Sequence, residues 1–202
     1  MPLWIRRRRS GHDLERRAVL AERRLCAYID VMGRSRNARD ADPVSSRFPM
    51  LDDIYNRRIL ELAADIPRLG RLHTPDASAS AHSKLCGSTV TVDLVTDEAG
   101  STVTDFGHEV KACALGQASS SLMARHVVGA SADELRQVRE RMRAMLKENG
   151  SPPEGRWADL AVLEPVRDFR ARHASTLLTF DAVVNALDQI AARKAVPSEA
   201  AE

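Results

Sequence analysis

Two cysteines stand where sulfur could do chemistry. Cys113 directly precedes the run Ala114-Leu115-Gly116-Gln117-Ala118-Ser119-Ser120-Ser121, which is typical of the start of a helix built from small residues. The free N–H groups and the dipole at a helix start favour an anion, so a thiolate is stabilised there. The small serines predict an open side from which a partner could reach the sulfur. The same pattern also fits a buried, inert cysteine, because free cysteine is among the most buried residue types.

A predicted β-hairpin brings a second cysteine to the same place. Residues Thr89–Val95 alternate between apolar and polar side chains, Asp97–Gly100 has turn composition, and Ser101–Val110 resembles a return strand. Cys86 comes just before the first strand and Cys113 just after the second. Because these two ends are neighbours in an antiparallel pair, we expect both sulfurs at one edge of the sheet.

The remaining elements are predicted to be mostly helical. Leu51–Asp65 has helical periodicity, and the Ser- and Ala-rich stretch from Pro75 to Ser83 is interpreted as a loop. A capping box at Ser131–Glu134 opens a helix that ends at Asn149-Gly150. Further helices are expected over Trp157–Leu163, which stops at Pro165, and over Ala174–Ala192. This order predicts an α+β fold, a small antiparallel sheet with helices on one face.

Composition narrows the class of protein. The 202 residues are 44% hydrophobic and 29% charged, as in soluble globular proteins. No apolar run is long enough to span a bilayer, and the basic start lacks the apolar segment of a secretory signal. Three cysteines are too few for a disulfide framework, so a reducing, cytoplasmic location is expected.

The chain is predicted to have three parts. Residues 1–49 hold 12 arginines against 6 acidic residues, a net charge of +6 in a chain whose total is +2. Such an arm could bind nucleic acid or a membrane surface. We instead expect a flexible extension or a mis-assigned start before Met50, and neither nucleic acid nor membrane as a partner. One domain is expected over residues 50–192, followed by a polar tail over 193–202.

Three ordered motifs give the domain a family resemblance. They are Cys86-Gly87-Ser88, then Cys113 with Ala118-Ser119-Ser120-Ser121, then the run Ala174-Ser175-Thr176-Leu177-Leu178-Thr179-Phe180-Asp181-Ala182. From about Met50 to Ala191 the chain resembles the NifU N-terminal, IscU and SufU family of iron–sulfur cluster assembly scaffolds. In that family the first motif is Cys-Gly-Asp and the third contains a cysteine. Here the aspartate is Ser88 and the third cysteine is Ser175.

The resemblance implies a scaffold or carrier, not an enzyme. It would hold iron or a labile iron–sulfur cluster through Cys86 and Cys113, with His173 and Ser175 as further ligand candidates, or zinc in place of iron. Its partners would be a cysteine desulfurase and acceptor proteins. A homodimer would supply missing ligands. Two alternatives stay open: a thiol that accepts persulfide sulfur or pairs as a Cys86–Cys113 disulfide, and a degenerate relative that binds partners without metal.

Overall fold

A three-stranded antiparallel sheet carries the segments that hold both cysteines. The computed structural model describes residues 57–195, so the expected extension over 1–49 and most of the expected tail lie outside the described residues. The elements, in chain order, are α3 (Arg57–Ala64), β1 (Ala77–His82), β2 (Thr89–Thr96), β3 (Val103–Lys111), α4 (Ala114–His126), α5 (Ala132–Lys147), η2 (Gly155–Asp168) and α6 (Arg170–Ala195).

The predicted hairpin is present as β2 and β3. Their register pairs Thr89 with Lys111 and Leu94 with Phe106, with an irregularity between Val95 and Thr96. Strand β3 begins at Val103, two residues after the predicted Ser101. The apolar side of β2, formed by Val90, Val92 and Leu94, is fully buried. The alternation seen in the sequence therefore marks the face of the sheet that packs on the core.

The prediction of a loop from Pro75 to Ser83 is wrong, because this stretch contains the edge strand β1. Ala77 and Ala79 are buried and the sheet order is β1-β2-β3, with His82 opposite Thr89. Alanine and serine have low β-propensity, and that composition hid the period-two alternation of Ala and Ser. Small side chains let α6 pack on this strand.

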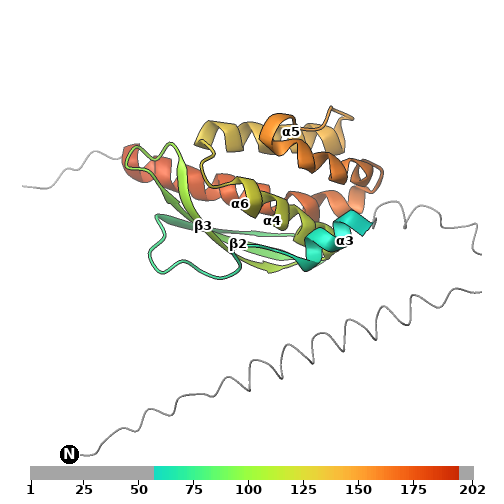
Figure 1. The fold of residues 1–202 in the computed structure, drawn as a ribbon, viewed down its shortest axis with the longest axis horizontal. Coiled ribbons are helices and arrows are strands. Elements are labelled where there is room, and N and C mark those ends of the chain that lie inside the picture. Colours follow the sequence, from blue (N-terminus) through green and yellow to red (C-terminus); the bar gives the residue numbers. More distant parts are fainter. Residues whose placement is uncertain (1–56, 196–202) are drawn as a thin grey trace, which may run out of the picture. The chain divides into compact units, whose positions relative to one another are not determined.

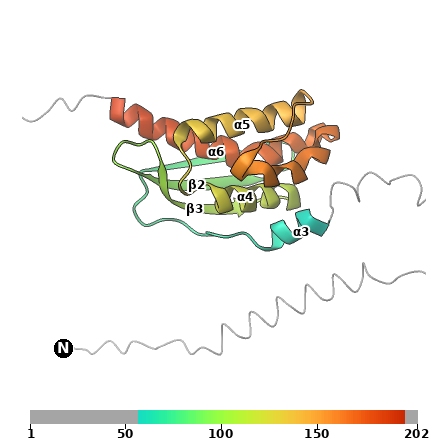
Figure 2. The ribbon, with the colours of Figure 1, turned by 45° about the horizontal axis from the view of Figure 1, so that its top comes forward.

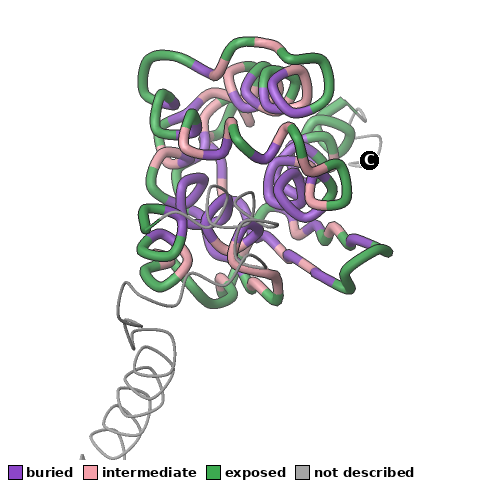
Figure 3. Tube along the Cα trace, turned by 90° about the vertical axis from the view of Figure 1, so that its right-hand side faces the viewer, coloured by how far each residue is buried: buried purple, intermediate pink, exposed green. Residues whose placement is uncertain are grey.

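Helices cover one face of the sheet in two layers. α6 contacts β1 and β2, while α4 contacts β3 and lies beside α6. α5 and η2 contact these helices on the side away from the sheet (Figures 1 and 2). Buried residues line the facing sides of the helices and the sheet (Figure 3). The predicted α+β fold is confirmed. Within residues 57–195, no helix is both long and apolar enough to cross a bilayer.

The two helical segments after α5 differ from their predictions. The short helix expected over Trp157–Leu163 is a 3₁₀ segment, η2, that runs through Pro165 to Asp168. The last helix begins at Arg170, four residues before its predicted start, and continues to Ala195. The earlier start matters for the site, because it places His173 inside the helix.

A polar cluster around Asp93 holds the segment before β1 against the face of the sheet opposite the helices. Asp93 is fully buried there and accepts hydrogen bonds from Arg71 Nε and Nη2, at 2.7 and 2.8 Å, from Leu72 N at 2.9 Å and from Ser78 Oγ at 2.5 Å. The crossing chain is so close that a Cβ on Gly107 would lie 2.8 Å from Gly70 O. Burial alone would raise the pKa of Asp93, but the hydrogen bonds from Arg71 and Ser78 outweigh it and lower the pKa.

We expect Asp93→Asn to destabilise the protein by about 2 kcal/mol near neutral pH, because it removes the charge from several hydrogen bonds. A carboxylate with a lowered folded-state pKa contributes its full stability above the unfolded pKa of about 3.9, and the contribution is lost as pH falls through the folded value. The difference between the two proteins in urea unfolding should therefore shrink on acidification below about pH 4. Asp105→Asn, at an exposed ion pair with Arg68, should change stability by less than about 0.5 kcal/mol. A pH-independent difference would contradict this assignment.

Candidate functional site

Cys86 lies in the tight loop between β1 and β2. Ser83 N donates to Ser88 O at 2.8 Å, and Gly87 N donates to Ser83 O at 2.9 Å, so the six residues from Ser83 to Ser88 close on themselves. Gly87 has φ +69, which glycine adopts without a steric penalty. The loop holds Cys86 as a free, exposed thiol at the end of the sheet.

Hydroxyl groups surround the sulfur of Cys86. Its Sγ lies 3.3 Å from Ser83 Oγ and 3.0 Å from Ser88 Oγ. Hydrogen bonds to these two hydroxyls, with a smaller contribution from Ser175, lower the pKa of Cys86 to about 7. A large fraction of the thiol is therefore ionised near neutral pH, and the thiolate is the form that reacts as a nucleophile and can ligate a metal.

Cys113 caps the start of α4 and is half-buried. Its backbone is extended, with φ −66 and ψ 168, and its side chain does not bond the helix N–H groups. Instead its Sγ donates to Ser175 Oγ at 3.5 Å. Ser175 is fully buried in the first turns of α6 and donates in turn to Arg172 O at 2.9 Å.

The structure brings Cys86, Cys113 and Ser175 to one end of the sheet. The pairing of Thr89 with Lys111 places the segments that carry the two cysteines side by side, as the hairpin predicted. The hydroxyl of Ser175 hydrogen-bonds to Cys113 and also contributes to the lowered pKa of Cys86. Two thiols and one hydroxyl therefore form a single rim that soft metal or sulfane sulfur could reach from the Cys86 side.

A close helix contact holds this arrangement. A Cβ on Gly116 would lie 2.7 Å from Ala112 Cβ and 3.1 Å from Ser175 O, so only glycine lets α4 approach α6 this closely. The serines that follow do not form the open side expected from the sequence, because Ser119, Ser120 and Ser121 are all fully buried. Access to the sulfurs comes from the β1–β2 loop.

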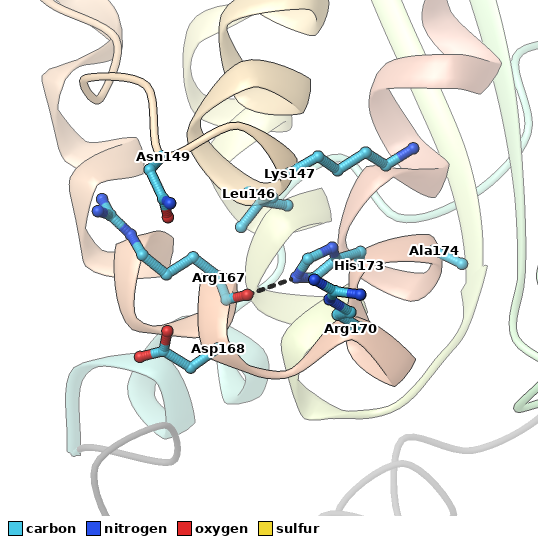
Figure 4. A pocket seen from close by; sticks show the side chains of 8 residues that line it. All are labelled: Leu146, Lys147, Asn149, Arg167, Asp168, Arg170, His173 and Ala174. Carbon is cyan, nitrogen blue, oxygen red and sulfur yellow. Dashed lines mark hydrogen bonds between the residues drawn. The ribbon is translucent and has the colours of Figure 1, made fainter.

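His173 forms no hydrogen bond with Cys86 or Cys113. Its ring is buried, and Nε2 donates to Val166 O at 3.1 Å and to Arg167 O at 2.9 Å. It lines a separate hollow between α5, η2 and α6 (Figure 4). Among residues 57–195, no three side chains of His, Cys, Asp or Glu are grouped to hold a metal ion. A metal-ligand role for His173 stays a prediction without geometric support.

The two hydroxyls that act on Cys86, those of Ser83 and Ser88, were not predicted from the sequence. Ser88 was considered only as a substitute for a carboxylate, and Ser83 was placed in a loop. The available signal was their spacing, three residues before and two residues after the cysteine, with Gly87 between. A serine on each side of a cysteine in a tight turn places donors near the thiolate.

We expect Ser88→Ala to raise the pKa of Cys86 by about one unit, because one of its two main hydrogen-bond donors is lost. The pH profile of alkylation by iodoacetamide reports this midpoint. The assay uses a Cys26→Ser, Cys113→Ser background, in which Cys86 is the remaining cysteine. Ser80→Ala, which removes a hydroxyl bonded to Thr91 on the exposed part of the sheet, serves as the control and should leave the midpoint unchanged. Equal midpoints for Ser88→Ala and the parent would refute the role of the hydroxyl.

The chain is similar to a known protein family and to solved structures. The model of the NifU-like N terminal domain matches residues 54–176. A crystal structure of a nitrogen-fixing NifU-like protein (N-terminal) from Brucella abortus is 64% identical, with a TM-score of 0.69, and the match covers 71% of this chain and 99% of that one. No match is found among curated proteins.

A more distant structure shows the same fold. It is a putative iron–sulfur cluster assembly scaffold protein for the SUF system from Fervidobacterium islandicum AW-1, 20% identical with a TM-score of 0.62. The match covers 67% of this chain and 98% of that one. The family match spans more than half of the sequence and includes Cys86, Cys113 and Ser175. The chain therefore belongs to the family of NifU-like N-terminal domains.

Proposed function

We propose that this chain is a scaffold and carrier for iron–sulfur cluster assembly, which holds iron or a labile cluster as cargo between Cys86 and Cys113. One observation carries the proposal: an exposed thiol of low pKa and a half-buried thiol share one rim around Ser175. Membership of the NifU-like family supports it. Thiolates are soft ligands and suit iron–sulfur clusters.

The two sulfurs have different roles in the proposal. Cys86 is exposed and readily ionised, so it meets incoming sulfur or iron first. Cys113 is held by Ser175 and provides the fixed second ligand. Two thiolates leave a tetrahedral iron short of ligands, because the neutral hydroxyl of Ser175 is a weaker ligand than a thiolate. We propose that a second copy of the chain completes the set, and that weak ligation favours release of the cargo.

The proposed partners approach over the β1–β2 loop. Leu85, next to Cys86, is 77% exposed, and Lys84 beside it is also exposed. An exposed leucine beside a reactive thiol offers an apolar contact to a protein that exchanges sulfur or cluster there. We propose a cysteine desulfurase as the sulfur donor and apo-proteins as acceptors. The chain then carries cargo without turning over a substrate of its own.

A second candidate function is that of a persulfide acceptor, which the exposure and low pKa of Cys86 favour. The Cys86 thiolate would attack the outer sulfur of a donor persulfide. The new S–S bond forms as the donor's S–S bond breaks, and the donor leaves as a thiolate. The step needs no external oxidant or reductant, because sulfane sulfur only changes carrier.

Cys86→Ser and Cys113→Ser should each abolish cluster uptake, since each removes half of the thiolate ligands. The measurement is visible absorbance, together with iron and acid-labile sulfide, after anaerobic incubation with a cysteine desulfurase, L-cysteine and ferrous iron. Cys26→Ser, which changes the cysteine outside the described residues, is the matched control and should load normally.

The other possible results of this experiment distinguish the alternative functions. Full absorbance with Cys113→Ser would overturn the two-thiol site. Added sulfur mass on Cys86 with no retained iron favours the persulfide acceptor. Stoichiometric zinc in the protein as purified, before iron is added, favours a zinc-binding relative. A protein that takes up neither metal nor sulfur is the metal-free interaction protein.

Ser175→Cys should slow release of the cargo about tenfold or more, because a third thiolate joins the rim where the hydroxyl now lies 3.5 Å from Cys113 Sγ. The rate of iron transfer to a chelator from loaded protein measures this. Thr176→Cys, the next residue of α6 and equally buried, is the control and should release at the parent rate. Release from Ser175→Cys at the parent rate would show that position 175 does not face the cargo.

A further inference from the structure

A hollow of about 770 Å³ lies away from the two thiols, between the end of α5, the end of η2 and the start of α6. Its volume is within the usual range of about 300–1,000 Å³ for small-molecule sites. Figure 4 shows Arg167 and Asn149 at one end and Lys147 and Ala174 at the other, with Arg170 and His173 between them. The proposed scaffold function uses none of these side chains.

Positive charge from three separate elements gathers around this hollow. Lys147 comes from α5, Arg167 from η2 and Arg170 from α6. Lys147 and Arg170 form no ion pair or side-chain hydrogen bond with any residue in the described range 57–195. Arg167 is paired with Glu164 on its own segment. Like charges held around one cavity repel each other, and a bound anion would relieve that repulsion.

Among the described residues, the lining contains one carboxylate, that of Asp168, and it does not neutralise Lys147 and Arg170. Asp168 forms no ion pair with a described residue. In Figure 4 its carboxylate points away from Arg170 and from Lys147. The cations are therefore available to a ligand that enters the hollow.

The hydrogen bonds of His173 hold the backbone segments that line the hollow. His173 as a whole residue is 7% exposed, and its Nε2–H donates to the carbonyls of Val166 and Arg167. These bonds join the end of η2 to the start of α6, so the segments that carry Arg167 and Arg170 are held relative to each other. A site with a fixed backbone loses less entropy when a ligand binds.

We propose that this hollow binds a small polyanion with two or more separated anionic groups, of the polyphosphate or polycarboxylate class. The spread of the cations along the hollow in Figure 4 favours separated charges over a single compact anion. Over the part of the chain that the structure describes, the lining has no Phe, Tyr or Trp side chain on which a nucleobase could stack, and His173 is buried with its Nε2–H bonded to backbone carbonyls. Charge-assisted hydrogen bonds from lysine and arginine supply the affinity.

The hollow is connected to the sulfur rim through three consecutive residues of α6. His173 and Ala174 line the hollow, and Ser175 bonds to Cys113. A ligand that fixes the first turns of α6 also fixes the hydroxyl that lies against the thiols. The binding claim itself does not depend on the iron–sulfur function, and its test needs no metal.

Titration of the full-length protein with tripolyphosphate and with citrate by isothermal calorimetry tests the proposal. At least one of the two should bind, and the tighter one identifies the class. Lys147→Gln combined with Arg170→Gln should weaken that binding about a hundredfold or more, since the double variant removes two charge-assisted hydrogen bonds. Both side chains project from the surface of helices, so the double variant should keep the parent melting temperature.

Two controls make the result decisive. Arg141→Gln removes another unpaired cation from α5, outside this hollow, and should leave the affinity unchanged. Orthophosphate, with one compact charge, should bind at least about tenfold more weakly than the polyanion. The proposal is overturned by the absence of binding for both polyanions, by an equal loss in Arg141→Gln, or by orthophosphate binding as tightly as tripolyphosphate.

Discussion

The pairing of Thr89 with Lys111 is the constraint on which the site depends. It sets the register of β2 against β3, and the register decides that Cys86 and Cys113 meet at one end of the sheet. A slip of one residue would turn the buried face of β2 outward, with Val90, Val92 and Leu94 exposed to water. Burial of aliphatic side chains therefore fixes the position of the sulfurs, although Cys86 is exposed and Cys113 is only partly buried against the core.

The contact between α4 and α6 adds the third group of the site. Gly116 permits the approach, and the helix around it is not optimised for stability: Ser119 Oγ and Ser120 Oγ are buried without a hydrogen-bond partner among the described residues. Each such hydroxyl costs roughly 1–3 kcal/mol of desolvation. Small residues at these positions keep α4 close to its neighbours, and that closeness places Cys113 against Ser175.

The sequence predicts those parts of the fold that burial patterns encode strongly. Alternation of large apolar residues predicted β2 and β3, and from them the convergence of the cysteines. The edge strand β1 was missed because its buried positions are alanines, which carry little hydrophobic signal. His173 was proposed as a ligand because it lies two residues before Ser175 in the sequence. Residues two apart on a helix do not share a face, so the true start at Arg170 separates His173 from Ser175.

The serine at position 175 changes the electrostatics of the rim as well as its ligand count. A third thiolate there would add negative charge beside Cys86 and Cys113, and like charges raise the pKa of each thiol. The hydroxyl of Ser175 instead carries no charge, accepts a hydrogen bond from Cys113 and helps to lower the pKa of Cys86. Metal affinity and thiol reactivity are thus opposed at this position. With serine at position 175, Cys86 ionises more readily than it would beside a third thiolate. In the scaffold function that we propose, the same residue would weaken the ligation of cargo and so favour its release.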